Sequence, residues 1–490
     1  MRSAILLAFV ALYGCASAPG YRSSSVRSPA SFREDPQPLA TSPEGHPLAP
    51  APEGPHPLSP SPSGRGGTQD KPAVSPNYWN QLGDTTLSRL VDEVLRANLD
   101  VRSARARVSA ARSDRVRTVL DLTPSATVAA GYSRQRLSTA SFPGALGVFP
   151  DQNVWDAGVN ASWDLDVFGG IRHTVQARGA LADVAEASLR DVQVAMTAEV
   201  ARAYFELRGA QEQLEVARRN AENQRHTFEL TQERLAAGRG SAFDTERAQA
   251  QLSSTLASIP AREAQVAAAQ YRIGTLVGRS PTDVARELEQ TGPLPSLPEV
   301  TSIGTPDAVV RYRPDVAAAE RFAAAQGALV GAAKASYLPR LTIGGSAGYA
   351  APEFNSVGNQ GTLRYVVGPV ITWPGLNLGR VKAEVDAAQA REDAARAQYG
   401  RAVLAATEDI ETSLARYRAA RLQVERLQEA SAASERAAEL ARLRFREGIT
   451  DFLQVLDAER TELEAQDRLA QGRIDAATAY AALYRAVGGG

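Results

Sequence analysis

The sequence predicts a mainly α-helical fold with a membrane β-barrel, built from two copies of one unit. Three observations predict it. The two halves of the chain align with each other, and each half holds a helix-prone stretch of about 67 residues. Each half also holds short segments in which apolar and polar residues alternate. Internal duplication explains how 490 residues can form one architecture rather than several unrelated domains.

The N-terminus has the features of an export signal. Arg2 precedes a short apolar run at 4–12, which is too short to cross a bilayer as a helix. Cys15 is the only cysteine and follows Leu-Tyr-Gly, a pattern typical of a bacterial lipobox. We interpret 1–14 as a lipoprotein signal peptide and expect Cys15 to carry a diacylglycerol and an N-acyl chain, which anchor it in lipid. An ordinary secretory signal with an incidental cysteine is the alternative.

Residues 15–76 are expected to form a lipidated, disordered tether. Positions 16–76 hold 14 of the chain's 28 prolines, together with many Ser and Gly residues. This composition cannot bury enough apolar surface to fold. It predicts an extended, partly polyproline chain between the anchor and the folded part.

The two copies keep a nearly constant spacing along the chain. Asp100 and Pro124 recur 215 residues later, and beyond them the offset is 210 residues. The pairs at the offset of 210 are Trp163 and Trp373, Gly169 and Gly379, Gly238 and Gly448, and Gly278 and Gly488. We therefore expect a first repeat at 77–292, a linker at 293–312 and a second repeat at 313–490.

Two strands are expected in each repeat. Val159, Ala161, Trp163 and Leu165 alternate with polar residues, and the second repeat shows the same alternation. Alternation with period 2 predicts half-buried strand. The expected strand regions are about 125–165 and about 340–373.

A long helix that reverses at a glycine should follow the strands in each repeat. We expect helix hairpins at about 170–278 and about 380–487, with turns at Gly238 and Gly448. A glycine inside a helix costs about 1 kcal/mol relative to alanine, so a recurrent one indicates a turn. A helix of about 67 residues is about 100 Å long, which fits a coiled coil or helical tube but no compact domain.

Four strands cannot cross a membrane as an open sheet, because the backbone groups of both edges would be unpaired in lipid. Three chains would supply twelve strands, which lies in the range of known barrels. The alternative is a soluble β-ribbon cap on a helical bundle. The export signal and the lipid anchor favour the membrane barrel.

Several segments in order resemble one known family. They are NYWNQLGDTTLSRLVDEVLRANLDVRSA at 77–104, AYFELRGAQ at 203–211, RYRPDVAAAE at 311–320, YLPRL at 337–341 and REGITDFLQVLDAER at 446–460. They resemble the TolC-like outer-membrane efflux channels, in the OprM/NodT lipoprotein branch. The resemblance implies a homotrimer with a twelve-strand β-barrel in the outer membrane and a twelve-helix α-barrel in the periplasm. It also implies a periplasmic adaptor and an inner-membrane RND pump, which dock at the far end of the helical tube.

The resemblance further assigns a gate to the two helix turns, where acidic residues of the family form rings around the three-fold axis. Gln454 stands where the doubly acidic version has its first Asp, and Thr450 where some relatives carry an Arg. The positions that match the motif are Asp457 and Asp244 as acidic residues, Leu453 as an apolar constriction, Phe445 as an aromatic residue and Arg460 as a basic residue. For any single Asp, the alternative is a solvated helix face.

The function that the resemblance implies is the exit duct of a tripartite RND-type efflux pump, with no enzyme activity and no cofactor. The four His are scattered, and we find no nucleophile–base set, phosphate loop or metal-site spacing. A net charge of −1 gives no electrostatic reason to expect nucleic acid. Two alternatives remain open: the outer-membrane component of a type I protein-secretion system, and a non-conducting structural coiled-coil lipoprotein.

Overall fold

The computed structural model describes residues 77–136, 151–300 and 306–489. The predicted signal peptide, Cys15 and the tether lie outside the described residues. The described chain forms two units, and each draws on both repeats. Unit 1 contains 104–189 and 315–402, and unit 2 contains 77–103, 190–314 and 403–489.

The two halves of the chain share one order of main elements, a helix, two strands and two long helices. The first half contains α2 (Asn77–Asn80), α3 (Thr85–Ala97), α4 (Leu99–Leu120), β1 (Ser125–Gln135), β2 (Gln152–Leu165), α5 (Gly170–Ala236), α6 (Ala242–Leu276) and α7 (Pro281–Glu287). The second half contains α8 (Pro306–Tyr312), α9 (Pro314–Ala335), β3 (Arg340–Ala351), η3 (Phe354–Ser356), β4 (Leu363–Thr372), η4 (Gly375–Asn377), α10 (Leu378–Arg446) and α11 (Phe452–Ala486). The long helices α5 and α10 have 67 and 69 residues, so the mainly helical fold with a few antiparallel strands is confirmed.

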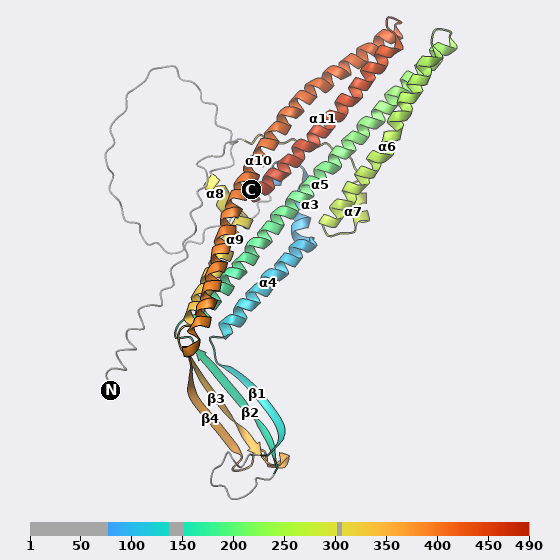
Figure 1. Cartoon of the computed structure of the whole chain (residues 1–490). Coiled ribbons are helices and arrows are strands. Elements are labelled where there is room, and N and C mark those ends of the chain that lie inside the picture. Colours follow the sequence, from blue (N-terminus) through green and yellow to red (C-terminus); the bar gives the residue numbers. More distant parts are fainter. Residues whose placement is uncertain (1–76, 137–150, 301–305, 490) are drawn as a thin grey trace, which may run out of the picture. The chain divides into compact units, whose positions relative to one another are not determined.

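Unit 1 contains an antiparallel sheet in the order β1-β2-β3-β4 (Figure 1). Its register decides which side chains share a face, because directly paired residues point the same way. Val128 pairs with Val159, Val159 with Ala347, and Ala347 with Tyr365. This face is apolar along all four strands, and Val128 and Tyr365 are 83% and 77% exposed within the single chain. The other members of this face include Ala126, Tyr132, Trp155, Ala161, Trp163, Leu341, Ile343, Tyr349, Val367 and Ile371.

The opposite face of the sheet carries mostly small and polar side chains. Its members include Ser125, Thr127, Gly131, Asp156, Gly158, Asn160, Ser162, Asp164, Thr342, Gly344, Ser346, Gly348 and Arg364. Thr342 donates a hydrogen bond to Asp164 over 2.5 Å, so polar groups on this face bond to one another. The sheet therefore has one apolar face and one polar face.

The helical part of unit 1 is held by small residues and by ion pairs. Arg112 of α4 lies 2.8 Å from Glu186 of α5. Gly331 of α9 faces the ring of His173 of α5, where an added Cβ would lie 2.9 Å from the imidazole. Alanine and glycine at such positions allow helices to approach closely.

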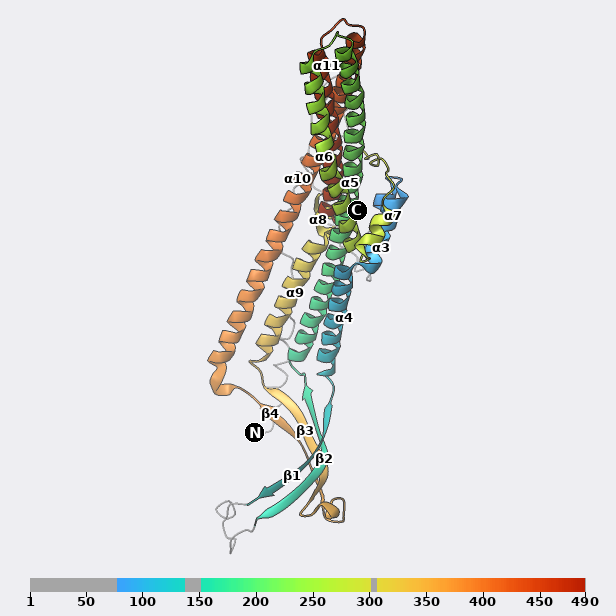
Figure 2. The same cartoon turned by 90° about the vertical axis from the view of Figure 1, so that its right-hand side faces the viewer.

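Unit 2 consists mainly of two helix hairpins, and their turns lie at the same end of the unit (Figures 1 and 2). Contacts between the hairpins join α5 to α11, where Gln213 and Gln471 are 3.2 Å apart, and α6 to α11, where Arg262 lies 2.7 Å from Asp467. Away from the turns, an aromatic core packs α2 against α5, α10 and α11. Its members are Tyr78, Trp79, Tyr204, Phe205, Tyr417, Tyr480 and Tyr484.

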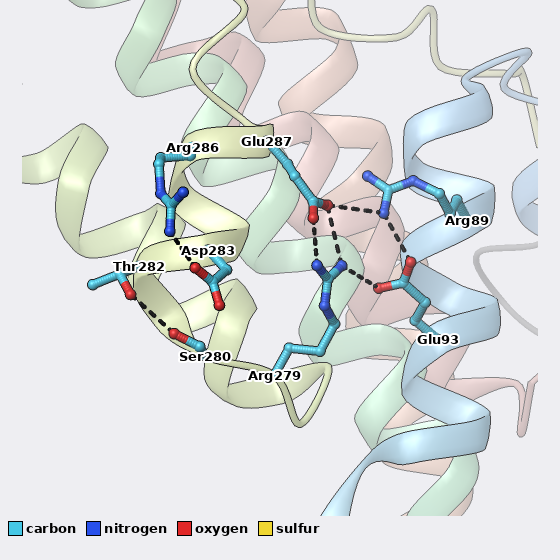
Figure 3. Close-up of polar contacts among 8 residues, drawn as sticks. All are labelled: Arg89, Glu93, Arg279, Ser280, Thr282, Asp283, Arg286 and Glu287. Atoms are coloured by element: carbon cyan, nitrogen blue, oxygen red, sulfur yellow. Dashed lines mark hydrogen bonds and ion pairs between the residues drawn. The ribbon is translucent and has the colours of Figure 1, made fainter.

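Charged side chains fasten α3 to α7 beside the end of α6 (Figure 3). Arg279 pairs with Glu287 and, over 3.5 Å, with Glu93. Arg89 completes the group with contacts to Glu93 at 2.8 Å and Glu287 at 3.4 Å. The four side chains are partly exposed, so each pair contributes at most about 1 kcal/mol.

Within the described residues, none of the helices combines the length and the apolar character that a membrane-crossing helix needs.

Candidate functional site

The two turns of unit 2 have the same backbone design. Gly238 and Gly448 have φ of 70° and 74°, a left-handed conformation that glycine adopts without steric cost. The N–H of Arg239 donates a hydrogen bond of 2.8 Å to the carbonyl of Arg234. The N–H of Ile449 donates one of 2.9 Å to the carbonyl of Arg444. These are Schellman turns, which satisfy the last carbonyls of α5 and α10.

A side-chain cap begins the helix after each turn. The side chain of Ser241 accepts a hydrogen bond from the N–H of Phe243 at the start of α6. The side chain of Asp451 accepts a hydrogen bond from the N–H of Gln454 at the start of α11. An N-terminal cap of this kind stabilises a helix by about 1 kcal/mol. The sequence thus reverses the chain twice with the same means, a glycine that ends one helix and a polar residue that begins the next.

The residues assigned to the gate fall into two groups. Leu453, Asp457 and Arg460 are exposed on α11, where Leu453 retains 53% of its surface. Phe445, by contrast, is buried to 6% exposure. It packs with Ala248, Phe452 and Val455 in a small apolar cluster. The structure therefore brings Leu453, Asp457 and Arg460 to one exposed stretch but places Phe445 beneath the surface.

The side chain of Asp457 is exposed on α11. Its backbone carbonyl accepts a hydrogen bond from the hydroxyl of Thr461, and no hydrogen bond or ion pair from another described residue reaches its carboxylate. Arg460 pairs with Glu464 one turn later, at 3.1 Å. Asp244 lies in the first turn of α6, where the N-terminus of the helix favours a negative charge.

The repeat offset shows how the two turns differ. Leu453 corresponds to Phe243, which is 64% exposed and lies under the guanidinium of Arg247 at 5.2 Å. Asp244 corresponds to Gln454, and Asp457 corresponds to Arg247. Each turn therefore presents an exposed apolar residue, but the carboxylates of Asp244 and Asp457 lie at different positions along their helices.

Arg234 joins the two hairpins at their turns. Its Nη1 donates a hydrogen bond of 2.7 Å to the carbonyl of Phe445, and its guanidinium carbon lies 4.5 Å from the centre of the Phe445 ring. The same carbonyl also accepts the N–H of Gly448. One side chain of α5 thus holds the end of α10 next to its turn.

Two buried carboxylates lie below this contact, between α10 and α11. Glu459 and Glu462 are each 4% exposed, and both face Arg442 of α10, at 2.9 and 2.7 Å. Thr227 of α5 donates a hydrogen bond of 2.8 Å to Glu459. Burial raises the pKa of the Glu462 carboxyl above its usual range; Arg442 lowers this pKa, but not enough to cancel the effect of burial and the smaller increases from Glu435 and Glu459.

The polar contacts continue along the helices. Gln466 donates a hydrogen bond of 3.2 Å to Glu462 and accepts one of 2.9 Å from Asn220 of α5. Together, Thr227, Glu459, Arg442, Glu462, Gln466 and Asn220 form what we call the polar ladder, which connects the first hairpin to the second.

A cleft of about 860 Å³ lies beside these contacts, between α5 and α10. Leu440 and Leu443 in its wall are exposed, and basic side chains flank them. The lining residues are Asn223, His226, Thr227, Leu230, Arg436, Glu439, Leu440, Arg442, Leu443, Phe445, Arg446 and Val455.

Sequence reasoning missed several of these residues. Phe243 could have been found, because it lies 210 residues before Leu453. Arg234, Glu459 and Glu462 could not, because nothing in a helical pattern tells which faces of two hairpins meet. Among the residues that the structure describes, no group of three or more His, Cys, Asp or Glu could hold a metal ion.

Comparisons with known proteins agree with this architecture. The sequence profile of the outer membrane efflux protein family matches residues 90–279 and 306–489. The pyoverdine export outer membrane protein OpmQ of Pseudomonas aeruginosa is 30% identical over 422 residues, which are 84% of this chain and 87% of that protein. Nodulation protein T of Rhizobium leguminosarum bv. trifolii is 28% identical over 418 residues, with coverage of 84% and 87%.

Solved structures lead to the same family. The outer-membrane channel OprN superimposes with a TM-score of 0.81 at 34% identity, over 97% of this chain and 99% of that one. The open state of the MtrE outer membrane channel of Neisseria gonorrhoeae superimposes with a TM-score of 0.77 at 25% identity, over 97% and 98%. The chain therefore belongs to the outer membrane efflux protein family, a family of channel proteins.

Proposed function

We propose that this protein is the outer-membrane exit duct of a tripartite RND-type efflux pump, and that small molecules pass through it from the periplasm to the exterior. One observation carries the proposal. The sheet of unit 1 has an apolar face with large exposed side chains and a polar face with small ones, which suits lipid on one side and water on the other.

The functional form that we propose is a homotrimer. β1 and β4 are the edges of the four-stranded sheet, and their outer backbone groups have no partner strand among the described residues. Lipid does not tolerate unpaired edges. If β1 of one chain pairs with β4 of the next, three chains close a barrel of twelve strands, and their polar faces line the lumen. The long helices α5, α6, α10 and α11 of the three chains would form a tube of twelve helices.

The gate of this channel is proposed to lie at the turns of unit 2. Asp457, Asp244, Leu453 and Phe243 would face the pore there, since no residue in the described part of the chain bonds to the Asp457 carboxylate and Leu453 and Phe243 are exposed. Three copies of Asp457 around one axis would attract cations and repel one another. The burial of Phe445 supports a different task for this residue, as the part of α10 that Arg234 holds.

Partners follow from the same proposal. A periplasmic adaptor would dock at the turns, where the cleft between α5 and α10 offers exposed Leu440 and Leu443, and an inner-membrane RND pump would supply the cargo. The names of relatives include a pyoverdine export protein and a toluene efflux pump component, so the cargo that we propose is small molecules. Lipid chains on Cys15 would fix the N-terminus in the outer membrane.

Conductance in planar bilayers tests the proposal. Purified full-length protein should run as a trimer and give discrete channel openings. Loss of the gene in a strain that has the cognate pump should raise the accumulation of a fluorescent pump substrate, and the wild-type gene should reverse this. A trimer that never conducts would support the structural lipoprotein instead, and a defect in protein export without a change in dye accumulation would support type I secretion.

A further inference from the structure

The polar face of the sheet carries a bidentate ion pair between Asp156 of β2 and Arg364 of β4. Nε and Nη2 of Arg364 each lie 2.6 Å from a different carboxylate oxygen of Asp156. Nη1 lies 3.4 Å from Oγ of Ser346 on β3. Paired N–H groups on a carboxylate fix both side chains in one plane, so this contact is better ordered than an ordinary surface pair.

The pair spans a strand, and glycine makes this possible. β3 lies between β2 and β4, and Arg364 is directly paired with Gly348, which in turn is paired with Gly158. Neither glycine has a side chain on the polar face, so the guanidinium can cross β3 to reach Asp156. A Cβ added at Gly348 would collide with the backbone of Ala157 and Gly158.

The ion pair lies at the end of the sheet that is away from the helices. Asp156 is close to the start of β2 and Arg364 is close to the start of β4, whereas α5 and α10 follow the other ends of these strands (Figure 1). In the orientation that we propose for the channel, with the helices in the periplasm, this end opens to the exterior.

We propose that Asp156 and Arg364 are specificity-determining residues of the channel exit, where three copies of the pair form a ring of balanced charge that lets cations and anions leave alike. The inference rests on the proposed function, because it needs the polar face to line the lumen of a trimer. Each chain adds one positive and one negative group, so the ring has no net charge. Loss of either member leaves three like charges at the exit.

Reversal potentials in planar bilayers test the inference on the full-length protein. Arg364→Gln should shift the permeability ratio toward cations, and Asp156→Asn should shift it toward anions. Each shift should be about two-fold or more at a salt concentration of about 10 mM, where the Debye length of ~30 Å spans the exit. The double variant D156N/R364Q should return to the wild-type ratio, because its ring is again neutral.

Arg134→Gln is the matched control. It removes the same charge at the same end of the sheet, but Arg134 is on the apolar face, where it lies opposite Asn153 in the register and 3.1 Å from Asp151. It should therefore leave the permeability ratio unchanged. Size-exclusion chromatography checks that each variant forms a trimer. If a single variant does not assemble, the permeability ratio of the double variant can still be measured.

The outcomes separate the two proposals. If the wild type conducts and R364Q and D156N keep its permeability ratio, the inference is wrong and the channel function stands. Shifts of both variants in the same direction, or an equal shift in Arg134→Gln, would also overturn it. A wild-type trimer that does not conduct would overturn the proposed function and the inference together.

Discussion

Arg234, near the end of α5, donates a hydrogen bond of 2.7 Å to the backbone carbonyl of Phe445, near the end of α10. Its guanidinium also lies over the ring of the same residue. This contact joins the two hairpins within a few residues of both turns. Movement of one hairpin away from the other must therefore break a charge-assisted hydrogen bond and a cation–π contact at the same time.

Loss of this contact should loosen the turns. Arg234→Ala is expected to raise the open probability of single channels and to lower the free energy of unfolding by about 1–3 kcal/mol, because both interactions are lost. Single-channel recording and thermal unfolding measure the two effects. Arg239→Ala is the control, since this exposed residue of the same turn contributes only its backbone. Equal effects of the two variants would contradict a specific role for Arg234.

The turn glycines should be needed because they adopt a left-handed backbone conformation, and not because a side chain would collide with a neighbour. A Cβ added at Gly448 meets no atom within 4 Å, yet φ is 74°. Gly448→Ala is therefore expected to lower the free energy of unfolding by about 1–2 kcal/mol, which is the cost of a left-handed alanine. Gly379→Ala is a control in open space within α10, and it should be neutral or stabilising. Chemical denaturation of both variants compares them, and an equal loss in both would show that the backbone argument fails.

Glu462 should make stability depend on pH. Its pKa is raised in the folded state, so the folded protein takes up a proton at a higher pH than the unfolded chain does. The Glu462 carboxyl therefore adds to the free energy of unfolding as the pH falls from its folded pKa toward its unfolded pKa. This contribution is absent at higher pH. Glu462→Gln removes it. The Tm of the wild type relative to the variant should therefore increase as the pH falls toward the ordinary pKa of a glutamate.

Glu464→Gln provides the comparison for this pH dependence. Glu464 lies on the same helix but is half exposed, where it pairs with Arg460 and Arg468. Its variant therefore removes a carboxylate from the surface of α11 and leaves the buried carboxyl of Glu462 in place. A profile of Glu462→Gln parallel to the wild type would mean that the carboxyl of Glu462 does not titrate in this range.

Much of the fold could be predicted from the sequence because it depends on local patterns. The long helices follow from helix-forming residues without proline around α10, and the turns follow from glycines that recur at Gly238 and Gly448. The strands follow from alternation near Val159 and Tyr365. Periodicity and glycine positions are properties of each segment alone, so no tertiary information is needed.

Contacts between segments were beyond such reasoning. Asp156 and Arg364 lie 208 residues apart, and only the register of three strands brings them together. Phe445 was assigned to the gate by its place in the turn motif. Its burial depends on how Arg234 and Val455 pack around it, which a motif does not encode.

The central claim is that the turns of unit 2 form the constriction of the channel, and Asp457 tests it most directly. The measurement is single-channel conductance of Asp457→Ala in planar bilayers, with and without a polyvalent cation on the side of the turns. Asp475→Ala, at a carboxylate farther along α11 that bonds to Gln471, is the control. The account predicts higher conductance and weaker cation block for Asp457→Ala alone, whereas wild-type conductance and wild-type block in this variant would contradict it.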